Sequence, residues 1–507
     1  MSVSIDLTKI QGNSFGGFNK DFQSNLFLKF NSADSGRAWI NEISGQISSS
    51  GDVIQFNNEF RALKRQGVKK PEALISAVWV NLALSFAGLR ALSLNAADLA
   101  KFPPSFKNGM AKASVGDTGS SDSSKWIAPF NAPSNVHAVL IVAADHPQEL
   151  VTRVGDLMAT AAFKAGVVVL LNQEGATRTD QPGHEHFGFK DGVSQPGIRG
   201  IDMPDDAIGN PNQGHPGQDL VWPGEFVLGY ETQKPVGDPN VDGPNPVPGP
   251  VSASGPAWTK NGSYLVFRRL RQDVPSFNKT VHDLSKLLGW SEELTGAKLV
   301  GRYKSGCPVE LRKFQSSPYH PPSTDPGDVN HGNPALATSN TLNNNFEFGL
   351  DPQGRNCPMS AHIRKAYPRD EETPAGGANS ESETQTHRLL RRGIPYGESY
   401  HPHVPGSGNV DRGLLFLAYQ NDIASHFEFV QNAWINNAAF PPNPSSQPPL
   451  KGAPGLDPII AQSSNGKMLI DPERLPFLVS HFVTTTGGEY FFSPSIDTLE
   501  SIGAGAL

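Results

Sequence analysis

The chain has 507 residues, 37% of them hydrophobic and 18% charged, which is enough to bury a large core and to form two or more domains. Its formal net charge of −7 argues against nucleic acid or an anionic membrane as the main partner. The two cysteines are too few for a disulfide scaffold, and no apolar run of about 18 residues predicts a transmembrane helix.

The N-terminal part alternates strand and helix patterns. Stretches rich in β-branched and aromatic residues predict strands, and apolar residues at helical spacing predict helices. The predicted strands are 24–31, 77–86, 137–144 and 166–172, and the predicted helices include 36–43 and 147–163. This order of elements predicts a ferredoxin-like sheet with helices on one face.

The C-terminal part repeats the pattern after a long connection. Residues 209–257 are rich in glycine, proline, asparagine and aspartate, with a strand predicted at 225–231. Further strands are predicted at 263–273, 387–393, 413–420 and 489–495, and helices at 281–289, 292–302 and 422–436. We therefore predict an α+β fold of two ferredoxin-like domains, residues 1–220 and 221–507, in a dimeric α+β barrel-like arrangement.

A glycine-rich run, GFKDG at 188–192, contains Asp191. The ordinary interpretation is a turn aspartate that bonds its own backbone, and the alternative is a carboxylate held for proton transfer. Just before this run, His184 and His186 flank Glu185. Such a histidine pair could hold a metal ion from one side of a strand, although solvated histidines are the simpler interpretation.

Two further segments carry histidine and arginine. His362 lies in CPMSAHIRKAYPRD (357–370), where nearby cations suit a haem whose iron is bound by imidazole and whose propionates pair with cations. A histidine beside a solvated basic face is the alternative. In HRLLRRGIPYG (387–397), strand alternation places Arg391 opposite to Arg388 and Arg392. One inward arginine could stabilise developing negative charge, and a structural ion pair is the alternative.

These motifs, together with GLLFLAYQ and FEFVQNAWIN, resemble the dye-decolorizing peroxidases, most closely their fungal branch, over nearly the whole chain. The resemblance implies one haem b per chain and a peroxidase that reduces hydrogen peroxide and oxidises dyes and phenolics by one-electron steps. It assigns His362 as the proximal ligand of the haem iron, Asp191 as the distal acid–base residue and Arg391 as the distal arginine.

The resemblance also assigns residues around the haem. Leu414 and Phe416 would pack over the distal haem face, Gly192 would let the backbone approach the haem plane, and Arg364 would pair with a propionate. Asp457 is the best candidate for the carboxylate that bonds the proximal imidazole. The sequence reads SHF at 480–482, where bacterial relatives tend to carry an aspartate.

Oxidation of large dyes would use surface residues. Tyr396 and Trp434 match positions that relatives use to pass electrons. We expect Tyr396 to be exposed, whereas Trp434 continues a helical apolar stripe and is expected to lie in the core. Glu347 and Asp351 are candidate ligands for Mn(II).

Two other functions stay open from the sequence. One is a haem-binding or haem-handling protein of the same fold with little turnover, and the other is a non-haem metalloprotein that uses His184, Glu185 and His186. Asp191 together with Arg391 favours catalysis, because a carrier needs neither. Fungal relatives are often secreted, so we expect an extracellular mature chain, with a cytoplasmic location as the alternative, and a monomer or weak dimer.

Overall fold

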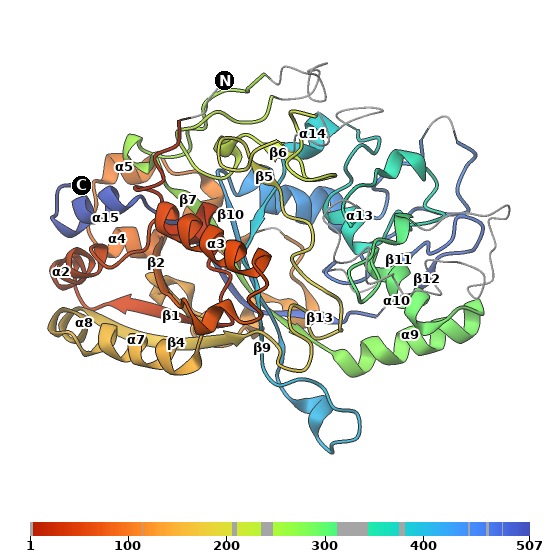
Figure 1. Cartoon of the computed structure of the whole chain (residues 1–507), viewed down its shortest axis with the longest axis horizontal. Coiled ribbons are helices and arrows are strands. Elements are labelled where there is room, and N and C mark those ends of the chain that lie inside the picture. Colours follow the sequence, from red (N-terminus) through yellow and green to blue (C-terminus); the bar gives the residue numbers. More distant parts are fainter. Residues whose placement is uncertain are drawn as a thin grey trace.

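The computed structural model of the chain describes residues 4–113, 115–204, 210–234, 247–311, 343–374, 381–444, 447–462, 466–478 and 480–507. Its centre is a nine-stranded sheet in the order β4-β1-β3-β2-β13-β7-β10-β8, with β9 also paired to β10 (Figure 1). The strands of this sheet are β1 (Phe22–Phe30), β2 (Val78–Ser85), β3 (Ala138–Ala144), β4 (Val167–Ala176), β7 (Ser263–Gln272), β8 (Leu390–Arg391), β9 (Ile394–Tyr396), β10 (Gly413–Gln420) and β13 (Val483–Ser493). Short separate pairs join β5 (Gly197–Ile198) to β6 (Leu220–Val221) and β11 (Lys467–Met468) to β12 (Phe477–Leu478).

The sheet consists of two halves with the same strand order. If the strands of each half are counted along the chain, both halves read fourth, first, third, second, which is the ferredoxin-like order. The halves join where β13 pairs with β2. At the outer edges β4 lies beside β9, and a Cβ on Gly175 would approach Ile394 to 2.5 Å. The sheet therefore curls into a barrel-like shape, and the predicted α+β fold is confirmed. The domain boundary near residue 220 stays a prediction.

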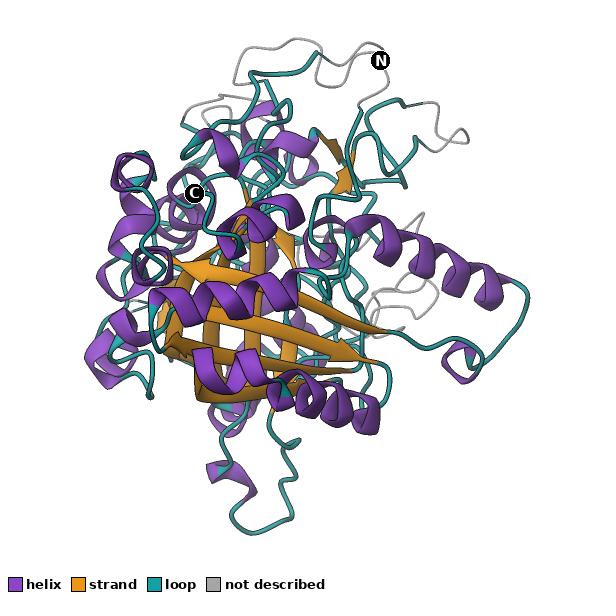
Figure 2. Cartoon of the chain, turned by 90° about the vertical axis from the view of Figure 1, so that its left-hand side faces the viewer, coloured by secondary structure: helices purple, strands orange, loops and turns teal. Residues whose placement is uncertain are grey.

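Helices cover the sheet, as Figure 2 shows. In the N-terminal half α2 packs on α8 and α15, and α7 packs on β3. The α-helices are α1 (Gly12–Phe15), α2 (Ala33–Ser44), α3 (Ser50–Arg65), α4 (Phe86–Ala91), α5 (Ala96–Ala100), α6 (Pro104–Asn108), α7 (Pro147–Ala159), α8 (Ala161–Gly166), α9 (Val274–Leu288), α10 (Glu292–Val300), α13 (His362–Ala366), α14 (Glu381–Gln385) and α15 (Ile496–Gly503).

Four predicted elements differ from the structure, and the strand at 387–393 is reduced to the two residues of β8. The helix at 147–163 breaks at Thr160, whose extended backbone ends α7 and whose side chain caps α8. The strand at 225–231 is wrong, because the N–H groups of Phe226 and Val227 bond back to the carbonyl oxygen of Pro223 in a turn. The helix at 422–436 is a π-helix, in two segments, η12 (Ala424–Glu428) and η13 (Val430–Ile435).

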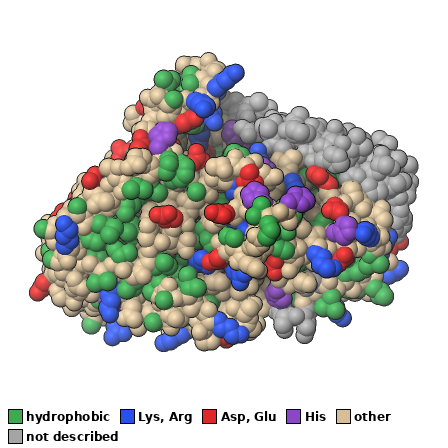
Figure 3. Space-filling view, turned by 90° about the horizontal axis from the view of Figure 1, so that it is seen from below, with side chains coloured by type: hydrophobic (Ala, Val, Ile, Leu, Met, Phe, Trp, Pro, Cys, Tyr) green, Lys and Arg blue, Asp and Glu red, His purple; other side chains and the backbone are tan. Residues whose placement is uncertain are grey.

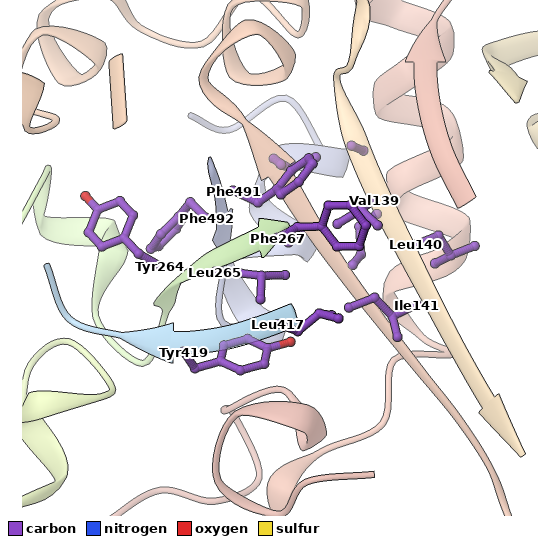
Figure 4. Close-up of a cluster of buried hydrophobic side chains, with 14 of the residues drawn as sticks. Val139, Leu140, Ile141, Tyr264, Leu265, Phe267, Leu417, Tyr419, Phe491 and Phe492 are labelled. Carbon is purple, nitrogen blue, oxygen red and sulfur yellow. The ribbon is translucent and has the colours of Figure 1, made fainter. Parts of the chain in front are cut away.

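The main core spans both halves. Figure 4 shows side chains of β3, β7, β10 and β13 within one buried cluster. Phe27 of β1 meets Phe267 of β7 at a ring-centroid distance of 4.8 Å. Because aromatic packing of this kind crosses from one half to the other, the two sheets form one rigid base for the loops at their ends.

The distribution of charged side chains on the surface agrees with the small negative net charge of the sequence. On the face shown in Figure 3, basic side chains are interspersed with acidic ones. Within the described ranges, no helix is both long enough and apolar enough to span a membrane.

Candidate active site

One cavity of about 270 Å³ brings together most of the residues selected from the sequence. Asp191, Gly192, His362, Arg391, Leu414 and Phe416 all line it. Leu414 and Phe416 are alternate residues of β10, so both side chains face the same side of the strand. Further apolar wall comes from Leu270, Val300, Ile459, Ile460 and Val483. The cavity is thus largely apolar with a few polar groups, as ligand sites usually are.

Asp191 and Arg391 form a polar pair in this cavity. Asp191 Oδ1 accepts a hydrogen bond from the N–H of Gly192 at 2.6 Å and lies 3.7 Å from Arg391 Nη1. Gly192 has φ +71°, a conformation that glycine adopts without strain. The side chains of Asp191 and Arg391 remain 38% and 36% exposed. Asp191 is therefore both a turn residue and a carboxylate that faces the cavity, so the two interpretations from sequence are compatible.

Arg391 is held in place by hydrogen bonds to residues other than Asp191. Its Nη2 donates to the carbonyl oxygen of Ser194 at 2.5 Å. The Gln195 side chain brackets the Arg391 backbone, donating to its carbonyl oxygen at 2.9 Å and accepting from its N–H at 3.3 Å. The loop that carries Asp191 thus also holds Arg391.

His362 begins α13 and is held by Asp457. The two are linked between His362 Nδ1 and Asp457 Oδ2 at 2.7 Å, and Asp457 Oδ1 accepts from the N–H groups of Ile459 and Ile460. Burial opposes a charge on His362, but the negative charge of Asp457 and their hydrogen bond raise its pKa overall. Because Nδ1 donates to the carboxylate, Nε2 is left as the available lone pair, and it bonds to no described residue.

Two buried arginines at the cavity form no ion pair with a described acidic side chain. Arg302 donates to the carbonyl oxygens of Gly306 and Asn343 and to the Asn344 side chain, and burial lowers its pKa to about 9. Arg369 donates to the carbonyl oxygens of Asn344 and Phe346. Sequence reasoning counted Arg369 among the cations near His362 that could pair with propionates, but it missed Arg302, because the pattern gives no sign that residue 302 lines the same cavity.

The expectation that Arg364 contacts a propionate is wrong. Arg364 is 0% exposed, does not line the cavity, and bonds Glu371 through both Nε and Nη2 and Asp351 through Nη1. Residues advance about 100° each around an α-helix, so Arg364 points away from the side of α13 that carries His362.

The expected surface oxidation sites are not at the surface. Tyr396 is 4% exposed, with its hydroxyl 3.3 Å from Asp411 and the Arg269 guanidinium over its ring, so its predicted exposure is wrong. Trp434 is 2% exposed and stacks on Phe440, as the core interpretation predicted.

The structure also speaks against the two non-haem metal sites considered from the sequence. Asp351 is buried and accepts from the N–H groups of Arg355, Asn356 and Cys357, so it is not a surface ligand for Mn(II) beside Glu347. Both ring nitrogens of His184 bond backbone carbonyl oxygens. His186 Nε2 bonds the carbonyl oxygen of Tyr396. In the described ranges no three His, Cys, Asp or Glu side chains are placed to hold a metal ion.

Comparison with known proteins agrees with this site. Residues 9–179 match the family model for the DyP dimeric alpha+beta barrel domain, and residues 245–440 match the model for the Dyp-type peroxidase C-terminal domain. A dye-decolorizing peroxidase of Mycetinis scorodonius is 30% identical, covering 99% of this chain and 88% of that protein.

Solved structures of dye-decolorizing peroxidases are similar to this chain over nearly its whole length. A fungal DyP-type peroxidase from Auricularia auricula-judae has a TM-score of 0.74 at 28% identity, covering 99% of this chain and 100% of that one. A dye-decolorizing peroxidase in complex with 2,6-dimethoxyphenol has a TM-score of 0.75 at 30% identity, with 99% and 100% covered. The chain therefore belongs to the dye-decolorizing peroxidase family, and it is a peroxidase.

Proposed function

We propose that the chain is a haem b peroxidase that reduces hydrogen peroxide and oxidises aromatic compounds by one-electron steps, with one haem per chain. The observation that carries this proposal is the convergence of two pairs on one cavity. His362, held by Asp457, offers an unpartnered Nε2, and Asp191 with Arg391 offers a carboxylate and a cation. The geometry favours an enzyme over a haem carrier, because binding alone needs no acid–base pair.

The cavity suits haem in its chemistry. A single imidazole lone pair can ligate iron, and the apolar walls formed by Leu414, Phe416 and their neighbours suit a porphyrin ring. Arg302 and Arg369, which form no ion pair with a described acidic side chain, would pair with the two propionates. When bound, haem supplies the iron centre at which peroxide is reduced. Asp457 would hold the His362 ring in the orientation that keeps Nε2 free.

The distal residues would handle the proton and the charge. An Asp191 carboxylate oxygen would take the proton from one oxygen of hydrogen peroxide and return it to the other, so that water can leave. The Arg391 guanidinium would stabilise the negative charge that develops as the O–O bond breaks. Leu414 and Phe416 would limit access of water and larger molecules on this side.

The test separates the three functions that the sequence left open. We expect a Soret band that is lost in His362→Ala, whereas a colourless protein would contradict the haem proposal. Asp191→Asn should keep the Soret band and slow the reaction with peroxide by about 10²- to 10⁴-fold. Asp283→Asn, on the exposed helix α9, is the matched control. Wild-type protein that binds haem but does not turn over an anthraquinone dye with peroxide would favour haem handling.

We also propose phenolic reductants and an extracellular location. The relative solved with 2,6-dimethoxyphenol supports phenols as substrates. Asn278, in the sequon Asn-Lys-Thr, is exposed on α9, which is compatible with glycosylation in a secretory pathway. Glycosidase treatment of protein recovered from culture medium tests this, and material found only inside cells would contradict it. Gel filtration tests the expected monomer or weak dimer.

A further inference from the structure

Glu185 places a carboxylate at the cavity, and this carboxylate forms no ion pair within the described ranges. Its Oε1 accepts from the N–H of Phe189, and its Oε2 accepts from the N–H of Phe187, both at 2.8 Å. Gln272 of β7 also donates to Oε2. Among the described residues no lysine, arginine or histidine forms an ion pair with this carboxylate. Burying a carboxyl group without a cation costs folding free energy unless its oxygens are hydrogen-bonded. These three hydrogen bonds therefore hold Glu185 in place.

These bonds close a tight turn directly before Asp191. The N–H of Glu185 donates to the carbonyl oxygen of Phe189 at 3.0 Å, and the N–H of Gly188 donates back to the carbonyl oxygen of Glu185 at 2.9 Å. The Phe187 ring stacks on Phe277 at 4.4 Å, which anchors the turn in a hydrophobic cluster. The carboxylate therefore ties residues 185–189 into one rigid unit.

The same unit is attached to the sheet and determines where Asp191 lies. Gln272 donates to Glu185 and accepts from the N–H of His186, so β7 holds the turn at two points. Two residues after the turn, the N–H of Asp191 donates to the carbonyl oxygen of Gly183 at 2.9 Å, just before Glu185. The segment that leads into Asp191 thus depends on the closed turn.

We propose that Glu185 is a positioning residue for Asp191, which acts by fixing the loop and takes no proton itself. This inference rests on the proposed function of Asp191. Proton transfer requires the acid–base group within a fraction of an ångström of its productive place, and a displacement of about 1 Å can cost about a hundredfold in rate.

The test uses Glu185→Gln in the haem-loaded protein. The amide keeps one acceptor oxygen, and at the Oε2 position this oxygen can still accept from Phe187 and Gln272. Its NH₂ group then faces the N–H of Phe189, so the bond to Phe189 is lost. We expect reaction with peroxide to slow by about ten- to a hundredfold while the Soret band is unchanged. Binding of hydrogen cyanide, which must give up its proton, should slow similarly, whereas imidazole, which gives up none, should bind normally. Amide hydrogen exchange in residues 184–192 should become faster.

A double-mutant cycle shows whether Glu185 acts through Asp191. In an Asp191→Asn background, Glu185→Gln should cause no further slowing, because Glu185 acts through Asp191. Glu489→Gln, at another buried carboxylate that accepts two backbone N–H groups, is the matched control and should leave all rates unchanged.

Each outcome decides the question. Normal cyanide and peroxide rates in Glu185→Gln would overturn the proposal, and so would an equal further slowing in the Asp191→Asn background. If Glu185→Gln does not bind haem, Gln272→Ala, which removes one donor to the same carboxylate, is measured by the same criteria. Normal peroxide reactivity in Asp191→Asn alone would instead overturn the proposed function, so the two failures are distinguishable.

Discussion

Glu489 of β13 predicts how the unfolding free energy of the protein changes with pH. Its carboxylate is 4% exposed, and Oε1 accepts from the N–H groups of Met110 and Tyr490 at 3.0 and 2.8 Å. Burial raises the pKa of Glu489 from the ordinary 4.5 to about 7, although these two hydrogen bonds oppose the rise. The folded protein therefore prefers the neutral carboxylic acid at this position.

The sign and size of the effect follow from this raised pKa. Below about pH 4.5 Glu489 is protonated in both the folded and the unfolded protein, and its contribution to stability is complete. As pH rises through about 7, this contribution is lost, because the unfolded protein ionises first. The difference between 4.5 and about 7 corresponds to about 3 kcal/mol of unfolding free energy.

Glu489→Gln replaces the carboxyl group by a neutral amide that can still accept both backbone N–H bonds. Its unfolding free energy should match wild type near pH 4.5 and exceed it by up to about 3 kcal/mol near pH 8, measured by urea denaturation across this range. Glu42→Gln, at an exposed position of α2, should show no such divergence. A difference that does not change with pH, or a less stable variant at pH 8, would refute the reasoning.

Three further predictions concern other buried charges. Burial lowers the pKa of Lys365 to about 7, so stability should rise with pH between about 7 and 10.5 by up to about 1.4 kcal/mol per pH unit, and Lys365→Met should lack this slope in urea denaturation. Arg364→Met should cost about 3–5 kcal/mol of unfolding free energy, because Glu371 is left buried without its cation, while the Soret band of folded protein stays in place. Arg302→Gln should lose haem to apomyoglobin about ten- to a hundredfold faster than wild type, and an unchanged transfer rate would remove Arg302 from the propionate site.

The fold was predictable where the signal is local. Strands β1, β2, β3 and β10 carry alternating or continuous apolar residues, and each was predicted within a few residues of its bounds. Helix α3 was missed although Val53, Phe56, Phe60 and Leu63 recur at helical spacing and Ser49 and Asp52 form a capping box. The π-helix was read as an α-helix because its apolar residues also fit a 3.6-residue period.

The sequence motifs predicted which residues line the cavity, but they did not predict which side chains contact one another there. The aspartate and histidine motifs marked residues that do line the cavity. Arg364 looked equivalent to Arg369 in the sequence, since both lie in one basic segment. Arg364 lies on α13, pointing away from the His362 side and bonding Glu371, whereas Arg369 lies beyond the end of α13 and lines the cavity. Similarly, Tyr396 is buried because β9 pairs with β10 and Arg269 covers its ring.

The separation of Asp191 and Arg391 is set by the scaffold more than by their attraction. At 3.7 Å, with both side chains over a third exposed, their ion pair is a weak constraint. Gln195 is a stronger one, because it bonds the Arg391 backbone at two points from the loop that carries Asp191. Asp191 comes from the loop after the N-terminal sheet and Arg391 from a strand of the C-terminal sheet. The position of this polar pair therefore depends on hydrogen bonds between the two halves, such as those of Gln195 to the Arg391 backbone. For this reason the sequence of either segment alone does not predict how far apart the two side chains lie.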